Sequence, residues 1–452
     1  MALATQPAAG ENLVYTPLPP CLAVTPSQLL IIRALSRFSN CPLARNAQKL
    51  NMLSLEQARE GILAAVRPLP SETVDLREAA GRFTAEPARS PVDLPPADNS
   101  AMDGYAVRAE DLAQAGAESP VTLRLIGAVP AGTGFDKRVE TGTCARVFTG
   151  SMLPPGADTV VMQEDVRRNE GDPSSVLFAQ RAAPWENVRL RGEDVKAGGL
   201  LLEAGERLTA PRLSLLAAAG ICSVRAGKRP MAGMVATGDE LREPGEAMEP
   251  GAIYESNRIG LATLARQAGA MTRVYPLVAD ELKATKEALA EALEECDVVI
   301  STGGVAAGEM DWVKGAFEAI GGQLDFWTVA IKPGKPLAFG RWREKLFFGL
   351  PGNPVSALVS FLLLARPALL RLQGARDILP RTFPASLSEP LANEGDRRHF
   401  MRVALDERGG ARSAGNQSSH ILSAMAQAGG LVDVPPKTTL AAGTVVAVLP
   451  WE

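Results

Sequence analysis

The sequence predicts a multidomain α/β protein, in which an α/β domain built on a parallel sheet is accompanied by mostly β domains. Residues 230–375 alternate short, continuously apolar strands with amphipathic helices, which is typical of a parallel sheet covered on both faces. Residues 91–195 and 376–452 lack helical periodicity and consist of short β-like runs between turns rich in glycine and proline. The chain has 452 residues, and at about 100–200 residues per domain this length corresponds to two to four domains.

The first 51 residues differ in composition from the rest of the chain. They contain four basic residues but only one acid, Glu11. We expect a disordered extension, because the segment "NMLSLEQAREGIL" around Met52 resembles a natural beginning. The alternative is a transit peptide, since such peptides are rich in arginine and poor in acids.

The remaining elements follow in order along the chain. From Leu55 to Val66 apolar residues recur every three or four positions, which predicts a helix that ends before Pro68. The region 91–195 then has strand-like runs such as "VTLRLIGAV" and "DTVVMQEDV". In the α/β region the expected helices cover residues 256–270, with Ser256 or Asn257 as N-cap, 281–296, 308–322 and 355–374. Short strands after Gly374 predict a small domain similar to a β-barrel.

The composition excludes several classes of protein and site. A net charge of −4 argues against a strongly basic nucleic-acid binder. With only His399 and His420, a histidine-rich metal centre or a Ser/His/Asp triad is not expected. The five cysteines form no CxxC pair, so neither a zinc site nor a disulfide framework is indicated. No run of about 20 apolar residues is expected to span a membrane, and we predict a cytoplasmic protein.

Three glycine-bearing loops follow apolar strands of the α/β region. Ligands of open α/β sheets bind at the carboxyl ends of the strands, where backbone N–H groups and helix N-termini can hold an oxyanion. We therefore predict a site for a phosphate-bearing ligand; the alternative is that the loops are simple tight turns. The candidates are Thr237 and Gly238 in the first loop, Ser301, Thr302, Gly303 and Gly304 in the second, and Pro351, Gly352, Asn353 and Pro354 in the third.

Acidic residues lie inside two of these loops: Asp239 and Glu240 in the first, and Glu309 and Asp311 in the second. Beside an anion site they would repel the ligand unless a hard cation lies between them. Mg²⁺ is the natural candidate, because it binds one or two carboxylates together with substrate phosphates. The alternative is that the acids cap helix N-termini, where each contributes about 0.3–1 kcal/mol.

Two lysines lie on a turn that prolines stiffen. In "AIKPGKPLAFG", Lys332 and Lys335 are three residues apart, with Pro333 and Pro336 beside them. This arrangement suits a cluster of anionic oxygens, and the alternative is a solvated turn.

A polar stretch, "DLPPADNSAMDGYAV", follows a double proline far upstream of these loops. It is too polar for a core strand, and we expect it to have a specific role. The alternative is a hairpin corner built on Asx turns.

Taken together, these segments resemble the molybdopterin molybdenumtransferase family, which includes the MoeA proteins and the E domain of gephyrin. The resemblance covers about residues 52–450, and the segments occur in the order of the family. They are "DNSAMDGYAV", "RVFTGSMLPPGADTVVMQED", "RGEDVKAG", "TGDEL", "YESNR", "STGGVAAGEMD", "IKPGKPLAFG" and "GLPGNPVSA".

The resemblance implies a four-part subunit and a homodimer. A first domain, residues 52–90 and 196–229, is split around an inserted mostly-β domain, residues 91–195. An α/β molybdopterin-binding domain, 230–375, and a C-terminal β domain, 376–452, follow. In the dimer, the inserted domain of one subunit would face the α/β domain of the other.

The reaction that the resemblance implies inserts molybdate into adenylylated molybdopterin with Mg²⁺, and yields molybdenum cofactor and AMP. The loops at 301–304 and 351–354 would hold the pterin phosphate and the nucleotide. Asp239, Glu240 and Asp311 would support Mg²⁺, while Lys332 and Lys335 would neutralise charge on phosphate or molybdate oxygens. Further site positions by resemblance are Asp103, Thr149 and Asp194 in the inserted domain, Asp280 in the α/β domain, and Arg402, Ser419 and His420 in the last domain.

One departure from the family pattern is Thr328, which stands where the family commonly carries a lysine. A cation is therefore missing from the expected set, which bears on rate and ligand identity more than on fold. Two alternatives stay open at this point: a molybdopterin adenylyltransferase, which would not need the inserted or C-terminal domains, and a non-catalytic scaffold of the gephyrin type. The expected partners are the substrates, a second copy of the chain and molybdenum enzymes that receive the cofactor.

Overall fold

The computed structural model describes residues 52–169, 171–304 and 312–451. The predicted extension 1–51 lies outside this part of the chain, as do Glu309 and Asp311. Residues Ser54–Glu452 form one compact unit, which contains all the elements that follow.

The α/β domain contains a six-stranded sheet whose first four strands are parallel. The predicted parallel sheet is therefore confirmed. Two further strands extend it, and each pairs antiparallel with its neighbour. The apolar run "PLAFGRW" forms one of these two strands, and it was not among the predicted strands. In spatial order the strands are β16 (Met271–Val274), β13 (Met231–Ala236), β17 (Val298–Thr302), β21 (Lys345–Leu350), β20 (Pro336–Trp342) and β18 (Gln323–Thr328).

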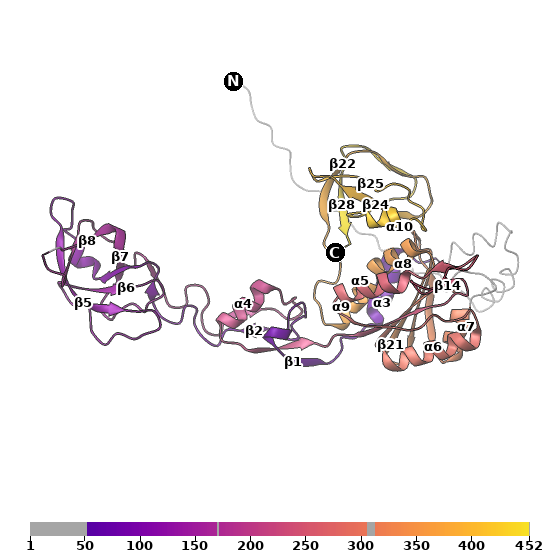
Figure 1. Ribbon diagram of the computed structural model, residues 1–452, viewed down its shortest axis with the longest axis horizontal. Helices are drawn as coiled ribbons and strands as arrows, with labels where there is room; N and C mark the ends of the chain where they lie inside the picture. The colour runs from indigo at the N-terminus through magenta and orange to yellow at the C-terminus, as the bar shows by residue number, and fades with distance from the viewer. Residues whose placement is uncertain (1–51, 170, 305–311, 452) are drawn as a thin grey trace, which may run out of the picture. The chain divides into compact units, whose positions relative to one another are not determined.

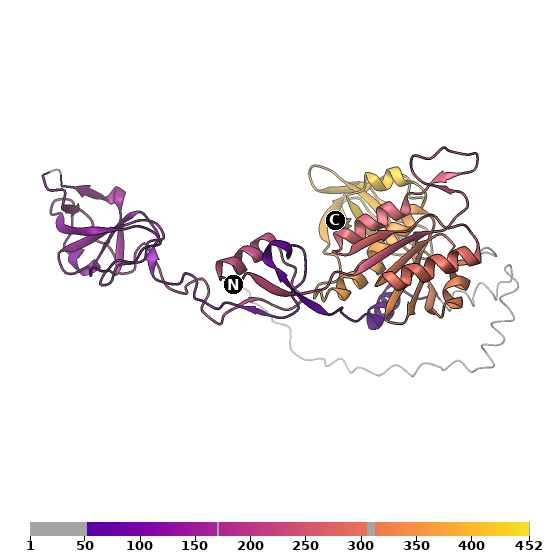
Figure 2. The ribbon, with the colours of Figure 1, turned by 60° about the horizontal axis from the view of Figure 1, so that its bottom comes forward.

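Helices cover both faces of this sheet. On one face, α6 (Leu282–Glu295) and α7 (Trp312–Ala319) contact each other, and on the other α5 (Asn257–Gln267) contacts α8 (Pro354–Ser360) (Figures 1 and 2). The core under α6 and α7 joins sheet residues such as Phe347 to Phe317 of α7, and neither side chain is exposed. Their rings stack at a centroid distance of 4.3 Å.

The helix predicted over 355–374 is continuous but irregular. It consists of α8, a π-helical turn η4 (Phe361–Ala365) and α9 (Arg366–Leu372). The wider turn ends two residues before Pro367, which has no N–H to donate to the preceding turn. The expectation that no segment is long and apolar enough to span a membrane was wrong here: Pro354–Leu372 has 19 residues and a mean hydropathy of 1.7. Since 83% of it is buried inside the protein, it is a core helix.

The inserted domain is mostly β, as predicted. Its six-stranded sheet includes β5 (Val121–Val129), which is the predicted run "VTLRLIGAV". The second predicted run, "DTVVMQEDV", begins as β7 (Thr159–Met162) and continues as a 3₁₀ turn, η3 (Gln163–Asp165). The sheet order is β7, β4 (Gly104–Val107), β6 (Thr143–Val147), β5, β9 (Ser175–Phe178) and β8 (Val166–Arg168).

Segments on either side of the inserted domain pair with each other. Strand β1 (Ser71–Asp75) pairs with β12 (Ser223–Gly227), and β2 (Ala88–Arg89) pairs with β11 (Leu200–Leu202). The predicted domain division groups helix α3 (Leu55–Ala65) with these segments, but the structure places it elsewhere. It contacts α9 and η4, so it packs on the core helix of the α/β domain.

The C-terminal region forms a closed five-stranded barrel. The strands run β24 (Arg398–Leu405), β25 (Gly410–Ser413), β22 (Phe383–Leu387), β28 (Val445–Pro450) and β26 (Gly430–Val434), and β26 pairs back to β24. A short strand from the α/β domain, β19 (Ile331–Lys332), joins β24 in parallel. The predicted barrel-like domain is confirmed, and the structure adds this strand to its edge.

We expect the substitution Phe317→Ala to lower the free energy of unfolding by about 3–5 kcal/mol, because it removes a fully buried ring and leaves a cavity. Urea denaturation followed by tryptophan fluorescence measures this change. The control is Val445→Ala, whose side chain is 68% exposed. A loss equal to that of the control would contradict the assigned core.

Candidate functional site

The three predicted loops lie together at one edge of the parallel sheet. The register aligns Ala236 of β13 with Thr302 of β17, and Thr302 with Leu350 of β21. The Thr237 N–H donates to the Thr302 carbonyl at 3.0 Å, which joins the first loop to the second. A Cβ built on Gly352 would lie 3.6 Å from the Cα of Gly303, so the second loop also touches the third.

Gly303 and Gly304 are required by the backbone of the second loop. Their φ angles are +87° and +58°, and a Cβ on Gly303 would lie 2.3 Å from the Thr237 carbonyl oxygen. Only glycine permits this close approach. Before them, the buried Ser301 hydroxyl has no hydrogen-bond partner in the described structure. The loop therefore combines a tightly constrained backbone with an unused polar group at the strand end.

Three of the predicted acids lie close together beside these loops. Asp239 accepts a hydrogen bond through Oδ1 from the Asp280 N–H at 3.0 Å. Burial raises the pKa of Asp280, and the charges of Asp239 and Glu240 raise it further. Carboxylates that oppose one another's ionisation are the ligand type that a hard cation prefers. Among described residues, however, no group of three or more His, Cys, Asp or Glu side chains is arranged to hold a metal.

The segment "ESNR" holds helix α5 against the site. Ser256 or Asn257 is predicted to cap this helix, but Ser256 occupies the N-cap position without a side-chain cap bond. Glu255 supplies the cap, because its Oε1 accepts from the N–H groups of Asn257 at 2.6 Å and Arg258 at 2.9 Å. Asn257 in turn donates to the Gly352 carbonyl at 2.8 Å and so fixes the third loop.

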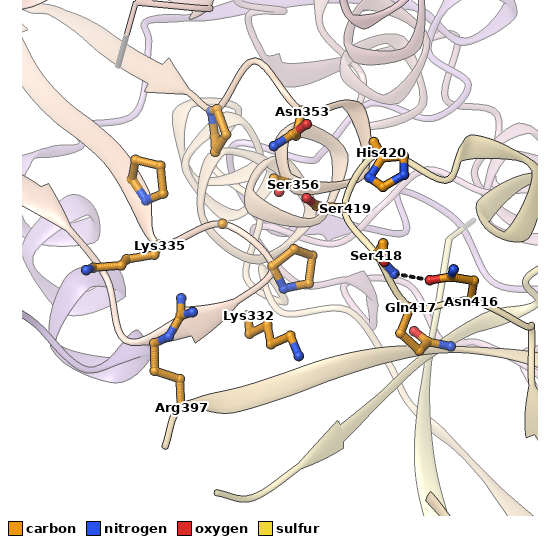
Figure 3. A pocket seen from close by; sticks show the side chains of 14 residues that line it. Lys332, Lys335, Asn353, Ser356, Arg397, Asn416, Gln417, Ser418, Ser419 and His420 are labelled. Carbon is orange, nitrogen blue, oxygen red and sulfur yellow. Dashed lines mark hydrogen bonds between the residues drawn. The ribbon is translucent and has the colours of Figure 1, made fainter. Parts of the chain in front are cut away.

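A cavity of about 570 Å³ lies beside the third loop, between the lysine turn and the C-terminal barrel (Figure 3). Its charged side chains at neutral pH are all cations: Lys332, Lys335 and Arg397. No described carboxylate lines it, so the cavity suits an anion. The other lining residues are Pro333, Gly334, Pro336, Pro351, Asn353, Ser356, Asn416, Gln417, Ser418, Ser419 and His420.

The cations in this cavity differ in their attachments. Arg397 donates to the Ile331 carbonyl at 2.7 Å, which anchors it to β19. Within the described part of the chain, Lys332 and Lys335 form no ion pair and are exposed. The two lysines are therefore the charges that remain free to meet a ligand.

Arg402 is predicted to lie on the binding surface, but the structure buries it behind the cavity wall. Its side chain is 1% exposed, so it cannot contact a ligand in the cavity directly. It accounts instead for the conformation of the cavity wall formed by residues 416–421. Its guanidinium donates to the carbonyls of Asn416 at 2.8 Å, Ser418 at 3.1 Å and Ile421 at 3.0 Å.

Two predicted site residues of the inserted domain, Asp103 and Thr149, contact each other where β4 begins and β6 ends. The Asp103 Oδ1 accepts from the Thr149 N–H at 2.7 Å and from its hydroxyl at 2.9 Å. These two bonds lower the pKa of Asp103. Asp194 is exposed in a separate turn of the described chain. The lining of the 570 Å³ cavity in this single chain includes none of the three.

His399, for which the sequence predicts no role, lies directly behind the lysine turn. It is 3% exposed and pairs in register with Lys332. Burial lowers its pKa to about 4, and the charges of Lys332, Arg402 and Arg397 act in the same direction. Its side chain is therefore neutral at physiological pH. The patterns in the sequence carry no signal for this, because the pairing joins two distant segments.

Three family models cover nearly the whole described chain. The MoeA N-terminal region (domains I and II) matches residues 53–220, a probable molybdopterin binding domain matches 233–371, and the MoeA C-terminal region (domain IV) matches 384–451. Together they span the inserted, α/β and barrel domains in order.

Similar proteins of known name agree with these matches. The molybdopterin molybdenumtransferase of Haemophilus influenzae is 38% identical over 89% of this chain and 99% of its own length. Molybdopterin molybdenumtransferase 2 of Mycobacterium tuberculosis is 37% identical over 89% of this chain and all of its own. The crystal structure of a molybdopterin biosynthesis MoeA protein from Pyrococcus horikoshii superposes with a TM-score of 0.77 at 32% identity, covering 88% of this chain and 99% of that one.

We expect the substitution His399→Gln to reduce the dependence of stability on pH between about 4 and 6.5. The unfolded chain takes up this proton near pH 6.5 but the folded chain only near pH 4, so acidification favours unfolding. The contribution of the neutral histidine is complete above pH 6.5 and is lost as the pH falls toward 4. Urea midpoints at pH 7.5, 6 and 5 measure the slope, and an unchanged slope in the variant would contradict the assignment.

Proposed function

The chain belongs to the MoeA family of molybdopterin molybdenumtransferases, and we infer from this that it is a transferase of molybdenum cofactor biosynthesis. It inserts molybdate into adenylylated molybdopterin, releases AMP and yields molybdenum cofactor. Cleavage of the phosphoanhydride adds water across a P–O bond. The phosphates and molybdate are all oxyanions, so the site must neutralise several negative charges at once.

The observation that carries the reaction is the cavity that holds Lys332, Lys335 and Arg397 without a described carboxylate. Fixed cations that face developing negative charge stabilise a transition state without reorganising. Arg397 is held by the Ile331 carbonyl and provides a fixed charge. The two lysines, which have no ion-pair partner in the described structure, neutralise the oxygens of the phosphate or molybdate.

The strand-end loops are proposed to hold the pterin phosphate and the nucleotide. The loop at 301–304 offers the buried and unpartnered Ser301 hydroxyl beside two glycines whose backbone can approach a ligand closely. The loop at 351–354 lies against it and leads into the N-terminus of α8, and Asn353 reaches the cavity of the lysines.

We propose Mg²⁺ as the cofactor, with Asp239, Glu240 and Asp311 as its ligands. When bound, it would act as a Lewis acid that withdraws charge from phosphate oxygens. Asp280 is the neighbouring acid, and its raised pKa would fall beside a divalent cation, since the cation favours its charged form. Asp311 lies outside the described residues, so its part rests on the family resemblance.

We propose that the protein is a cytoplasmic homodimer. Asp103, Thr149 and Asp194 are absent from the lining of the cavity in one chain, and a second subunit would supply them from its inserted domain. Molybdenum enzymes are the proposed recipients of the product. Neither a molybdopterin adenylyltransferase nor a scaffold is favoured, because the inserted and C-terminal domains match the transferase family along their lengths.

Incubation of the purified chain with adenylylated molybdopterin, Mg²⁺ and either molybdate or tungstate tests the function through AMP release. We expect release that depends on the oxyanion. The substitution Lys332→Ala should lower the rate on the order of 10²-fold, the cost of removing one preorganised group that stabilises charge. The control is Lys283→Ala on the exposed surface of α6. Binding of the substrate without AMP release under either oxyanion would overturn the transferase and favour a carrier.

The substitution Thr328→Lys is expected to lower the KM for the oxyanion by roughly tenfold. Thr328 pairs in register with Pro336, the residue after Lys335, so a lysine here adds a cation beside the turn. At contact distance an added unit charge contributes between about 1 kcal/mol in bulk water and about 4 kcal/mol near a protein surface. Steady-state kinetics at several molybdate concentrations measure the change, with Thr328→Gln as the neutral control. An equal KM in both variants would show that this position does not face the anion.

A further inference from the structure

A second cavity, of about 400 Å³, lies apart from the proposed transfer site. It shares no lining residue with the cavity of Lys332, and most of its lining comes from three separate segments. These are the segment 205–212 that follows the inserted domain, the core helix around Arg366, and residues 376–381 after that helix. We refer to it as the Arg366 cavity.

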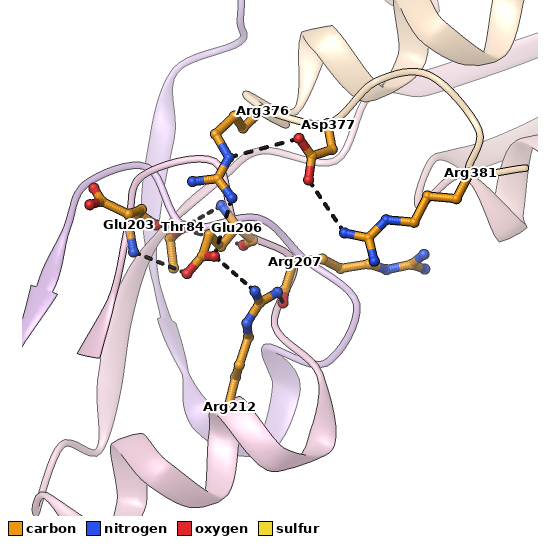
Figure 4. A network of polar contacts seen from close by, with 8 residues as sticks. All are labelled: Thr84, Glu203, Glu206, Arg207, Arg212, Arg376, Asp377 and Arg381. Carbon is orange, nitrogen blue, oxygen red and sulfur yellow. Dashed lines mark hydrogen bonds and ion pairs between the residues drawn. The ribbon is translucent and has the colours of Figure 1, made fainter. Parts of the chain in front are cut away.

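The lining of the Arg366 cavity has a large excess of positive charge. Five arginines face two carboxylates. Both carboxylates are already engaged in ion pairs (Figure 4). Glu206 pairs with Arg212 at 2.8 Å and with Arg376 at 3.4 Å. Asp377 pairs with Arg376 at 3.8 Å and with Arg381 at 3.6 Å. Within the described lining, the remaining arginines, Arg207 and Arg366, have no acidic partner.

Arg366 is the residue that this arrangement leaves unexplained. Its Nη1 is buried without a hydrogen-bond partner in the described structure. Burial lowers its pKa, and the charge of Arg207 lowers it further. A guanidinium whose buried Nη1 lacks an acceptor, beside a second guanidinium, is unfavourable. A doubly charged oxyanion between them would supply the missing acceptors, since guanidinium groups match phosphate geometry with paired hydrogen bonds.

The rest of the cavity wall is largely apolar but offers one more free donor. Leu362 and Leu370 are buried and line it together with Phe83 and Trp451. The buried Nε1 of Trp451 also lacks a hydrogen-bond partner among the described atoms. An apolar wall with a few convergent polar groups, in a volume of about 300–1,000 Å³, is typical of sites for small molecules.

We propose that the Arg366 cavity binds a phosphate monoester carried on a flat and mostly apolar body, with the phosphate between Arg366 and Arg207. The apolar body lies against the wall that contains Trp451 and Leu362. This second site goes beyond the proposed transferase activity. Mononucleotides and pterin phosphates are both phosphate monoesters of this kind. AMP is the one that the proposed transferase reaction itself releases.

Isothermal titration of the full chain with AMP tests the proposal. We expect two binding events per chain, one at the transfer site and one at the Arg366 cavity. Arg366→Met should remove one event, and Lys332→Ala should weaken the other. Inorganic phosphate should compete with AMP for the Arg366-dependent event, whereas adenosine, which lacks the phosphate, should not. A single event in the unsubstituted chain, or two undiminished events in Arg366→Met, would overturn the proposal.

Two further variants separate binding from folding. Arg366→Met removes a charge whose buried Nη1 has no hydrogen-bond partner in the described structure, so the melting temperature without ligand should stay equal or rise. Arg381→Met changes an exposed side chain and should weaken the same event at least threefold. The matched control is Arg77→Met, whose side chain is 88% exposed and pairs with Asp75 away from the cavity. Unchanged binding in Arg381→Met together with a lower melting temperature in Arg366→Met would assign the arginines a structural role and overturn the site.

The two proposals fail in different ways. If AMP release is absent but the Arg366-dependent event remains, the transferase is overturned and the second site stands. If AMP release is normal and no event depends on Arg366, only the second site is overturned.

Discussion

The parallel pairing of β13, β17 and β21 is the constraint on which the rest of the structure depends. Its register ends all three strands together, at Ala236, Thr302 and Leu350. The loops that follow are therefore brought within contact of one another, and the glycine at 303 permits the close approach to Thr237. Asn257 then ties the N-terminus of α5 to the third loop, so a helix as well as the sheet sets the shape of this edge.

The lysine turn acquires its position from a second pairing, between β19 and β24. Strand β19 leaves the α/β domain and joins the edge of the barrel. This pairing places Lys332 beside the buried and neutral His399. On the barrel side, Arg402 fixes the carbonyls of the opposite wall. The cavity is thus a product of two domains, and each contributes charges that the other does not neutralise.

Charge is separated along this edge of the molecule. Asp239, Glu240 and Asp280 gather beside the first loop, whereas Lys332, Lys335 and Arg397 surround the cavity beside the third. A ligand with several phosphates can meet cations directly at one end and, at the other, carboxylates through a bound divalent cation. The Arg366 cavity repeats the cationic arrangement elsewhere, but there the burial of Arg366 makes the unpaired charge more costly.

The fold class, the main helices of the α/β domain and the glycine loops could be predicted from the sequence, because hydrophobic periodicity and turn residues act over short distances along the chain. The sequence also identified both lysines and the acids as chemically unusual for their positions. Only the tertiary structure decided that Arg402 is buried behind the cavity, that Glu255 rather than Ser256 caps α5, and that α3 packs on the core helix. Each of these depends on contacts or burial set by how the chain packs, and local patterns carry no record of such packing. For the same reason His399, Arg207 and Arg366 became notable only once folding had removed them from water or placed them beside like charges.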